Sequence, residues 1–195
     1  MINFEELANA VNPNPGQTLK AAPTPPAYTI PAKLLSKGTT NAKTSKNALE
    51  TFILYMSPAA QNSKGADLCP FRSKGCTAAC LYTAGRGKFN NVQRARMNKS
   101  EYFTRDKKTF LAQLALELIA INKKQLKKGT KAAIRLNGTT DVDFLYLLKN
   151  RAGLDALQLE GLVFYDYTKD PHRVKRYAGT SYTLTFSRAE DNEPQ

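Results

Sequence analysis

Four segments of the chain join an apolar run to a polar end, and each predicts a β-strand. They are LETFILYMSP (49–58), KAAIRLNGTTD (131–141), GLVFYDYTKD (161–170) and SYTLTFSRAEDN (181–192). Short runs rich in β-branched and aromatic residues, closed by turn-forming residues, are typical of strands. We therefore expect about four strands, and each should deliver polar side chains where it ends.

The segments between these strands have helical periodicity. The strongest is TRDKKTFLAQLALELIAINKKQLKKG (104–129), in which Leu111, Leu114, Leu118 and Ile121 recur at helical spacing and Gly129 marks the stop. A second helix is expected in VDFLYLLKNRAG (142–153) with Thr140 or Asp141 as its cap, and a basic helix over 91–97. Alternation of strand and helix predicts the α/β class, with a parallel sheet of about four βαβ-connected strands in an open or incomplete (β/α) barrel-like arrangement.

The N-terminal quarter has a different composition. Residues 1–47 hold six of the ten prolines, and proline excludes both a regular helix and a central strand. We expect an extended Pro-rich arm over residues 1–47, with a short helix around Phe4–Val11. An α/β domain follows over residues 48–195.

The charge of the chain points to an anionic partner. Lys and Arg number 29 against 16 Asp and Glu, which gives a net charge of +13. A surplus of this size favours nucleic acid through a salt-sensitive term that is independent of sequence. The candidate surface interleaves basic and aromatic residues: Arg94, Arg96, Lys99, Tyr102, Phe103, Arg105, Lys107 and Lys108. The alternative is a solvated helix face with core aromatics.

All three cysteines, Cys69, Cys76 and Cys80, fall in one stretch with the spacing C-x6-C-x3-C. The chain has no signal-peptide-like N-terminus and no run of about 18 apolar residues, so we expect a cytoplasmic protein without membrane contact, where disulfides are rare. Three thiolates suit a [4Fe–4S] cluster, or zinc if the only histidine, His172, supplies a fourth ligand. The alternative is three buried thiols that only pack.

Polar residues at the strand ends predict a pocket, because the carboxyl ends of parallel strands lie on one edge of a sheet. The candidates for catalytic roles are Arg135, Asn137, Asp141, Asp166, Lys169, Ser187 and Arg188. The turn Gly85, Arg86, Gly87 and Lys88 is the candidate for binding an anionic group of a cofactor. Taken singly, these residue types are also common in turns and caps.

Several of these motifs together resemble the phage gene-product-eighty-eight family, whose function is uncharacterised. The resemblance rests on CPFRSKGCTAACLYTAGRGKFNNVQRAR, RLNGTTD, FYDYTK and LTFSRAEDN, and it covers about residues 44–192. It implies a phage protein in the infected host cell. Members usually continue well beyond the LTFSR strand, so the resemblance implies either a short form of the family or an open sheet edge that a second copy or a protein partner covers.

The layout is similar, more distantly, to radical S-adenosylmethionine enzymes, which carry three cluster cysteines after the first strand of a partial barrel. That likeness implies a cluster on Cys69, Cys76 and Cys80 with S-adenosylmethionine at its open iron. The typical spacing there is C-x3-C-x2-C, which differs from this chain. The expected function is therefore a radical-SAM-like or related metalloenzyme. The alternative is a non-enzymatic basic metal-binding protein that binds nucleic acid or a host protein.

Overall fold

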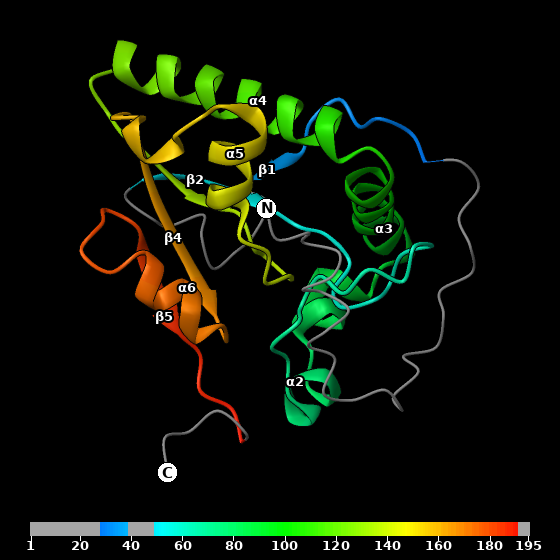
Figure 1. The fold of residues 1–195 in the computed structure, drawn as a ribbon. Helices are drawn as coiled ribbons and strands as arrows, with labels where there is room; N and C mark the ends of the chain where they lie inside the picture. Colours follow the sequence, from blue (N-terminus) through cyan, green and yellow to red (C-terminus); the bar gives the residue numbers. More distant parts are fainter. Residues whose placement is uncertain (1–27, 39–48, 191–195) are drawn as a thin grey trace.

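A five-stranded sheet runs through residues 28–38 and 49–190, the part of the chain that the computed structural model describes (Figure 1). The strands are β1 (Leu35–Lys37), β2 (Glu50–Leu54), β3 (Ala132–Arg135), β4 (Leu162–Thr168) and β5 (Thr183–Phe186). They lie in chain order; β1 pairs antiparallel with β2, and the later pairs are all parallel.

The helices lie between the parallel strands, as the alternating pattern predicted. They are α2 (Lys74–Ala78), α3 (Asn90–Arg105), α4 (Lys107–Lys127), α5 (Phe144–Ala152) and α6 (Pro171–Arg176), with 3-10 turns η2 (Leu81–Thr83), η3 (Gly85–Lys88) and η4 (Ala156–Gln158). In Figure 1, α4 runs along the top of the view and α3 descends at its right end. The arrow of β4 points to the lower half of the view, where α2 and α6 lie.

The core lies between one face of the sheet and the long helices. Phe52, Ile134 and Phe164 occupy one register row of three parallel strands, and all three are buried. Side chains alternate between the two faces of a strand, so the residues next to them point to the opposite face. The predicted stripe of α4 packs on this core, since Leu111, Leu114 and Leu118 are at most 1% exposed.

Two parts of the fold prediction are wrong. The sheet has five strands rather than about four, and it is open rather than barrel-like. The additional strand, β1, lies within residues 1–47, the range predicted as an extended arm. Its backbone pairs with β2, and Leu34 beside it is completely buried. The helix expected around Phe4–Val11 lies outside the described residues.

The helix ends also differ from the predictions in their capping residues. Asp143 caps α5 by accepting a hydrogen bond from the Tyr146 amide at 3.1 Å, in place of Thr140 or Asp141. The basic helix expected over 91–97 continues to Arg105, and Asp106 then caps α4. None of the helices in the described ranges is long and apolar enough to cross a membrane.

Candidate functional site at the strand ends

The ends of β3 and β4 are joined by a buried polar network. The Asn137 amide donates to Asp166 Oδ2 at 2.9 Å, and its side-chain oxygen accepts from the Thr140 hydroxyl and the Val142 amide. Asn137 and Asp166 are each 1% exposed. Burial raises the pKa of Asp166, although Asn137 and nearby arginines oppose that rise. These two predicted residues are thus close together, and they hold the edge of the sheet in place.

Asp141 lies beside this network and is bound from three directions. It accepts hydrogen bonds from the Thr168 hydroxyl at 2.8 Å and the Lys169 amide at 2.9 Å, and it pairs with the buried guanidinium of Arg173. Arg173 also donates to the Tyr182 hydroxyl at 3.1 Å. Burial raises the pKa of Asp141 in spite of Arg173. This pair connects β3, β4 and α6.

Arg173 and Tyr182 were not among the predicted site residues. Arg173 lies in α6, a helix that was not predicted from the sequence; Pro171 is its first residue, and Asp170 caps it by accepting a hydrogen bond from the His172 amide at 2.8 Å. An Asp-Pro pair at a helix start is a recognised signal, and it could have revealed this helix. Nothing local to the sequence could have paired Arg173 with Asp141.

The remaining predicted residues of β4 and β5 meet at the same edge. The Lys169 ammonium donates to the Ser187 hydroxyl at 3.2 Å and to the carbonyl oxygens of Ser187 and Arg188 at 3.3 and 3.1 Å. Arg188 itself is exposed. Arg135 lies at the end of β3, with its guanidinium 4.9 Å from the ring centroid of Tyr167 and 3.5 Å from Asp166. The structure therefore gathers all seven predicted residues along one edge of the sheet.

The cysteine loop is attached to this edge through its first cysteine. The Cys69 sulfur accepts from the Ala59 amide at 3.4 Å and lies 3.9 Å from the Thr139 carbonyl oxygen. The backbone amide of Asp141 donates to the Leu68 carbonyl oxygen at 2.8 Å, and this hydrogen bond fixes the loop to the segment after β3. Burial raises the pKa of the Cys69 thiol strongly, so in this arrangement it is protonated at neutral pH.

Cys76 and Cys80 do not share one helical turn. Cys76 lies within α2, but that helix ends at Ala78 and the backbone of Cys80 is extended, with φ −58° and ψ 126°. Burial is the main cause that raises the pKa of Cys76; Lys169 opposes it, and the charges of Cys80 and Asp141 add to it. Cys80 also contributes to the raised pKa of Cys69, so it lies within electrostatic range of both other thiols.

A carboxylate from beyond β5 anchors α2. Glu190 accepts from the Gly75 amide at 2.5 Å and the Ser73 hydroxyl at 2.9 Å, and these hydrogen bonds lower the pKa of Glu190. No residue of α2 is buried. The position of this short helix therefore depends on polar contacts at its N-terminus rather than on packing.

In residues 28–38 and 49–190, no three His, Cys, Asp or Glu side chains form a group that could hold a metal ion as they stand. The three thiols share one edge of the sheet without converging on a single point. His172 lies beside the loop, with its ring centroid 6.3 Å from that of Phe71, and it is exposed.

The predicted anion-binding turn is η3, and its second glycine has an internal role. A Cβ on Gly87 would lie 2.1 Å from the Tyr82 carbonyl oxygen and 3.0 Å from Arg96 Nη1, so only glycine fits there. The Gly87 amide donates to Ala84 at 2.9 Å. Arg86 and Lys88 are exposed on this turn.

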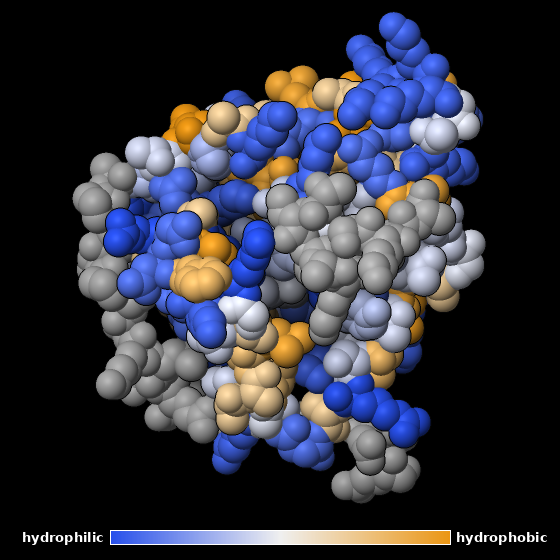
Figure 2. Space-filling model, turned by 180° about the vertical axis from the view of Figure 1, so that it is seen from behind, coloured by the Kyte–Doolittle hydropathy of each residue, from blue (hydrophilic) through white to orange (hydrophobic). Residues whose placement is uncertain are grey.

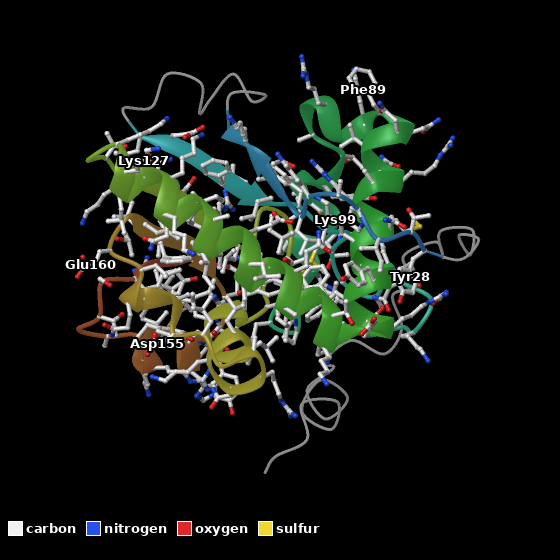
Figure 3. All side chains as sticks on the ribbon, turned by 90° about the horizontal axis from the view of Figure 1, so that it is seen from above. Tyr28, Phe89, Lys99, Lys127, Asp155 and Glu160 are labelled. Carbon is white, nitrogen blue, oxygen red and sulfur yellow. The ribbon has the colours of Figure 1, made fainter. Side chains whose placement is uncertain are left out.

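The basic surface expected over residues 94–108 is interior only in part: Arg94, Arg105 and Lys108 are exposed, whereas Lys99 and the two aromatic residues are buried. Lys99 is 8% exposed and its ammonium donates to the Leu34 carbonyl oxygen at 2.5 Å (Figure 3). Tyr102 and Phe103 belong to the aromatic core. Arg105 pairs with the buried Glu101 at 2.8 Å. The arginines and lysines of this helix thus stabilise the fold to a greater extent than the sequence pattern indicated.

The family model described as Gene product 88 matches residues 33–195. The chain belongs to the Gene product 88 family. This confirms the phage family that the motifs indicated, and the match begins earlier than the expected start near residue 44 because it includes β1. Neither the curated proteins nor the solved structures include a significant match. The likeness to radical S-adenosylmethionine enzymes is not supported by these comparisons.

The motifs that carried the family resemblance come together in space. In this Gene product 88 protein the cysteine loop, the turn after β3, the end of β4 and the segment after β5 all contact one another at one sheet edge. Four segments that are far apart in the sequence thus form one continuous region, which makes this edge the candidate site.

Proposed function

We propose that this Gene product 88 protein binds a metal centre through Cys69, Cys76 and Cys80 at the strand-end edge, and that the centre is a [4Fe–4S] cluster. The observation that supports this is the position of Cys80, whose charge acts on both other thiols. The three cysteines lie in a single loop, and this loop is attached to the sheet edge through Cys69. They offer the soft ligands that a cluster or a zinc ion requires.

Nearby cations would favour thiolate ligands. Burial raises the pKa of Cys76 and Lys169 opposes that rise, and a charge interaction links Cys80 to Arg96. The Ala59 amide already donates to the Cys69 sulfur. Hydrogen bonds and nearby cations offset the charge that three thiolates bring, and they tune such centres.

Metal binding requires the loop to adjust, because the thiols do not form a coordination group as they stand. The adjustment has a low packing cost, since α2 buries no residue. Binding also releases the thiol protons, because Cys69 and Cys76 have raised pKa values before loading. We therefore expect loading to be favoured by raised pH.

A cluster held by three thiolates would supply electron transfer and one open iron for a small molecule, of which S-adenosylmethionine is the expected example. The groups of this chain nearest to it would be Lys169, Asp141 and Glu190, which act electrostatically on Cys76. In this proposal Lys169 would act on the ligand through its charge, because its ammonium already donates to Ser187 and Arg188. Asp141 would remain a positioning residue, because its oxygens are occupied by Thr168, the Lys169 amide and Arg173.

The test is the metal content of protein purified without oxygen and again after reconstitution with iron and sulfide. We expect about four iron and four sulfide per chain, with a broad visible absorption that bleaches on reduction. Cys76→Ser should lose this metal, whereas Lys74→Ala, an exposed neighbour on α2, should keep it. About one zinc per chain would replace the cluster by a structural zinc site. No metal of either kind after reconstitution would overturn the proposal.

A further inference from the structure

The face of the sheet opposite the core carries alternating aromatic and cationic side chains. In register, Ile53 lies opposite Arg135, and Tyr165 and Tyr167 lie opposite Thr183 and Thr185. We call the following six residues the tyrosine–arginine track: Tyr167, Arg135, Tyr165, Tyr55, Arg96 and Tyr82. The track crosses β4, β3 and the end of β2 and continues into the cysteine loop and α3.

Cation–π contacts join neighbouring residues at each end of the track. The Arg135 guanidinium lies 4.9 Å from the Tyr167 ring centroid, and the Arg96 guanidinium lies 4.9 Å from Tyr55 and 5.4 Å from Tyr82. Burial raises the pKa of Tyr165, and Arg135, Tyr55 and Tyr167 all act on the same hydroxyl. Arg96 Nε is buried without a hydrogen-bond partner.

The track is accessible at one end and charged at the other. Tyr167 is 49% exposed, and the Arg135 side chain is 27% exposed. Beyond Arg96 lies η3, which is in contact with that guanidinium through Gly87 and presents Arg86 and Lys88 on the surface. The exposed ring of Tyr167 thus lies at one end of the track, and the exposed cations of η3 lie beyond the other end.

We infer that this face binds single-stranded nucleic acid. A base would stack on Tyr167, the exposed ring of the track, and phosphates would meet Arg135 and the cations of η3. Aromatic rings interleaved with arginines suit unpaired bases because every base has a π-face, and sites of this kind accept many sequences. The net charge of +13 favours a polyanion, and hydrophilic side chains cover much of the face in Figure 2 while hydrophobic ones form small separate areas.

A single strand fits this face better than a duplex. The sheet offers an exposed ring on which an unpaired base could stack, whereas the bases of a duplex are already stacked on each other. The inference does not depend on the metal centre, because no cysteine belongs to the track.

The test compares two exposed tyrosines that each lie beside an arginine. Tyr167 is 49% exposed with Arg135 at 4.9 Å; Tyr146 on α5 is 42% exposed with Arg176 at 5.1 Å, and it is not part of the track. Fluorescence anisotropy would measure the binding of labelled thymidine and uridine 20-mers to the whole chain, with thiols reduced and no metal added. The Tyr167→Ala variant loses the stacking of one base and should therefore bind about ten-fold more weakly than the wild type.

The controls separate stacking from charge and from folding. Tyr167→Phe keeps the ring and should bind like the wild type, and Tyr146→Ala should also bind like the wild type. A 20-mer without bases, carrying the same phosphates, should bind at least ten-fold more weakly than the thymidine strand. Wild-type affinity should fall as salt rises. The inference would be overturned if the thymidine strand and the strand without bases bound equally well, or if Tyr167→Ala and Tyr146→Ala weakened binding equally. A preference for the thymidine or the uridine strand would show which of these two strands the face accepts better.

Discussion

Lys99 provides the sharpest test of how α3 is packed. Its side chain enters the core from the middle of the helix, is 8% exposed and donates to the Leu34 carbonyl oxygen (Figure 3). Burial lowers the pKa of Lys99 from 10.5 to about 8. A charged ammonium in this position destabilises the folded state, because it leaves most of its hydration behind.

The pKa of Lys99 is 10.5 in the unfolded chain and about 8 in the folded chain, and these two values set the sign of the pH dependence. Between pH 8 and 10.5 the unfolded chain holds more protons on Lys99 than the folded chain does, so the free energy of unfolding rises with pH. Below pH 8 the folded state carries the full free-energy cost of the buried ammonium, and above pH 10.5 this cost is absent. One pKa unit corresponds to about 1.4 kcal/mol, so this lysine alone should add about 2–3 kcal/mol between pH 7 and 10.

The assay is urea unfolding of the wild type and of Lys99→Met across this pH range. Cys69 and Cys76, whose pKa values are raised, act in the opposite direction in both proteins, so the difference between the proteins is the quantity to follow. We expect the wild type to gain about 2–3 kcal/mol relative to Lys99→Met as pH rises from 7 to 10. Lys108→Met, which changes an exposed lysine of α4, should show no such trend. A flat difference for Lys99→Met would refute burial as the cause.

Two further changes test the packing of the strand ends. Gly138→Ala should destabilise the fold by about 1–3 kcal/mol, because its Cβ would lie 2.5 Å from the Tyr55 ring; a double change with Tyr55→Ala should recover part of this loss in urea unfolding. Asp141→Asn should cost about 3 kcal/mol, because it leaves the buried Arg173 guanidinium without its carboxylate. Asp155→Asn, which breaks an exposed ion pair, should cost less than about 1 kcal/mol. Equal losses from the two Asp changes would contradict the role of burial.

The strands and long helices could be predicted because their signals are local. The leucine spacing of α4 and the apolar runs of β2 and β4 follow from which side chains can face the core. Gly129, with φ of +63°, ends the helix region where the sequence indicated. The order of strands also implied that polar residues after β3, β4 and β5 would meet at one edge, and they do.

The missed features depend on partners that are distant in the chain. β1 is three residues long and gains its structure only by pairing with β2, so no periodicity of its own could reveal it. Lys99 and Tyr102 resemble a basic, aromatic surface in the sequence, and only the way α3 packs sends both inward.

The sequence by itself therefore determined the α/β class, the cysteine loop and the family, because periodicity and motif order are properties of neighbouring residues. The tertiary structure decided which charges are surface and which are core, and that Arg173 closes on Asp141 across 32 positions. It also decided that tyrosines and arginines from two strands, the residue after a third strand, a 3-10 turn and a helix form one track, because side-chain neighbours across a sheet are set by register, which only the folded chain possesses.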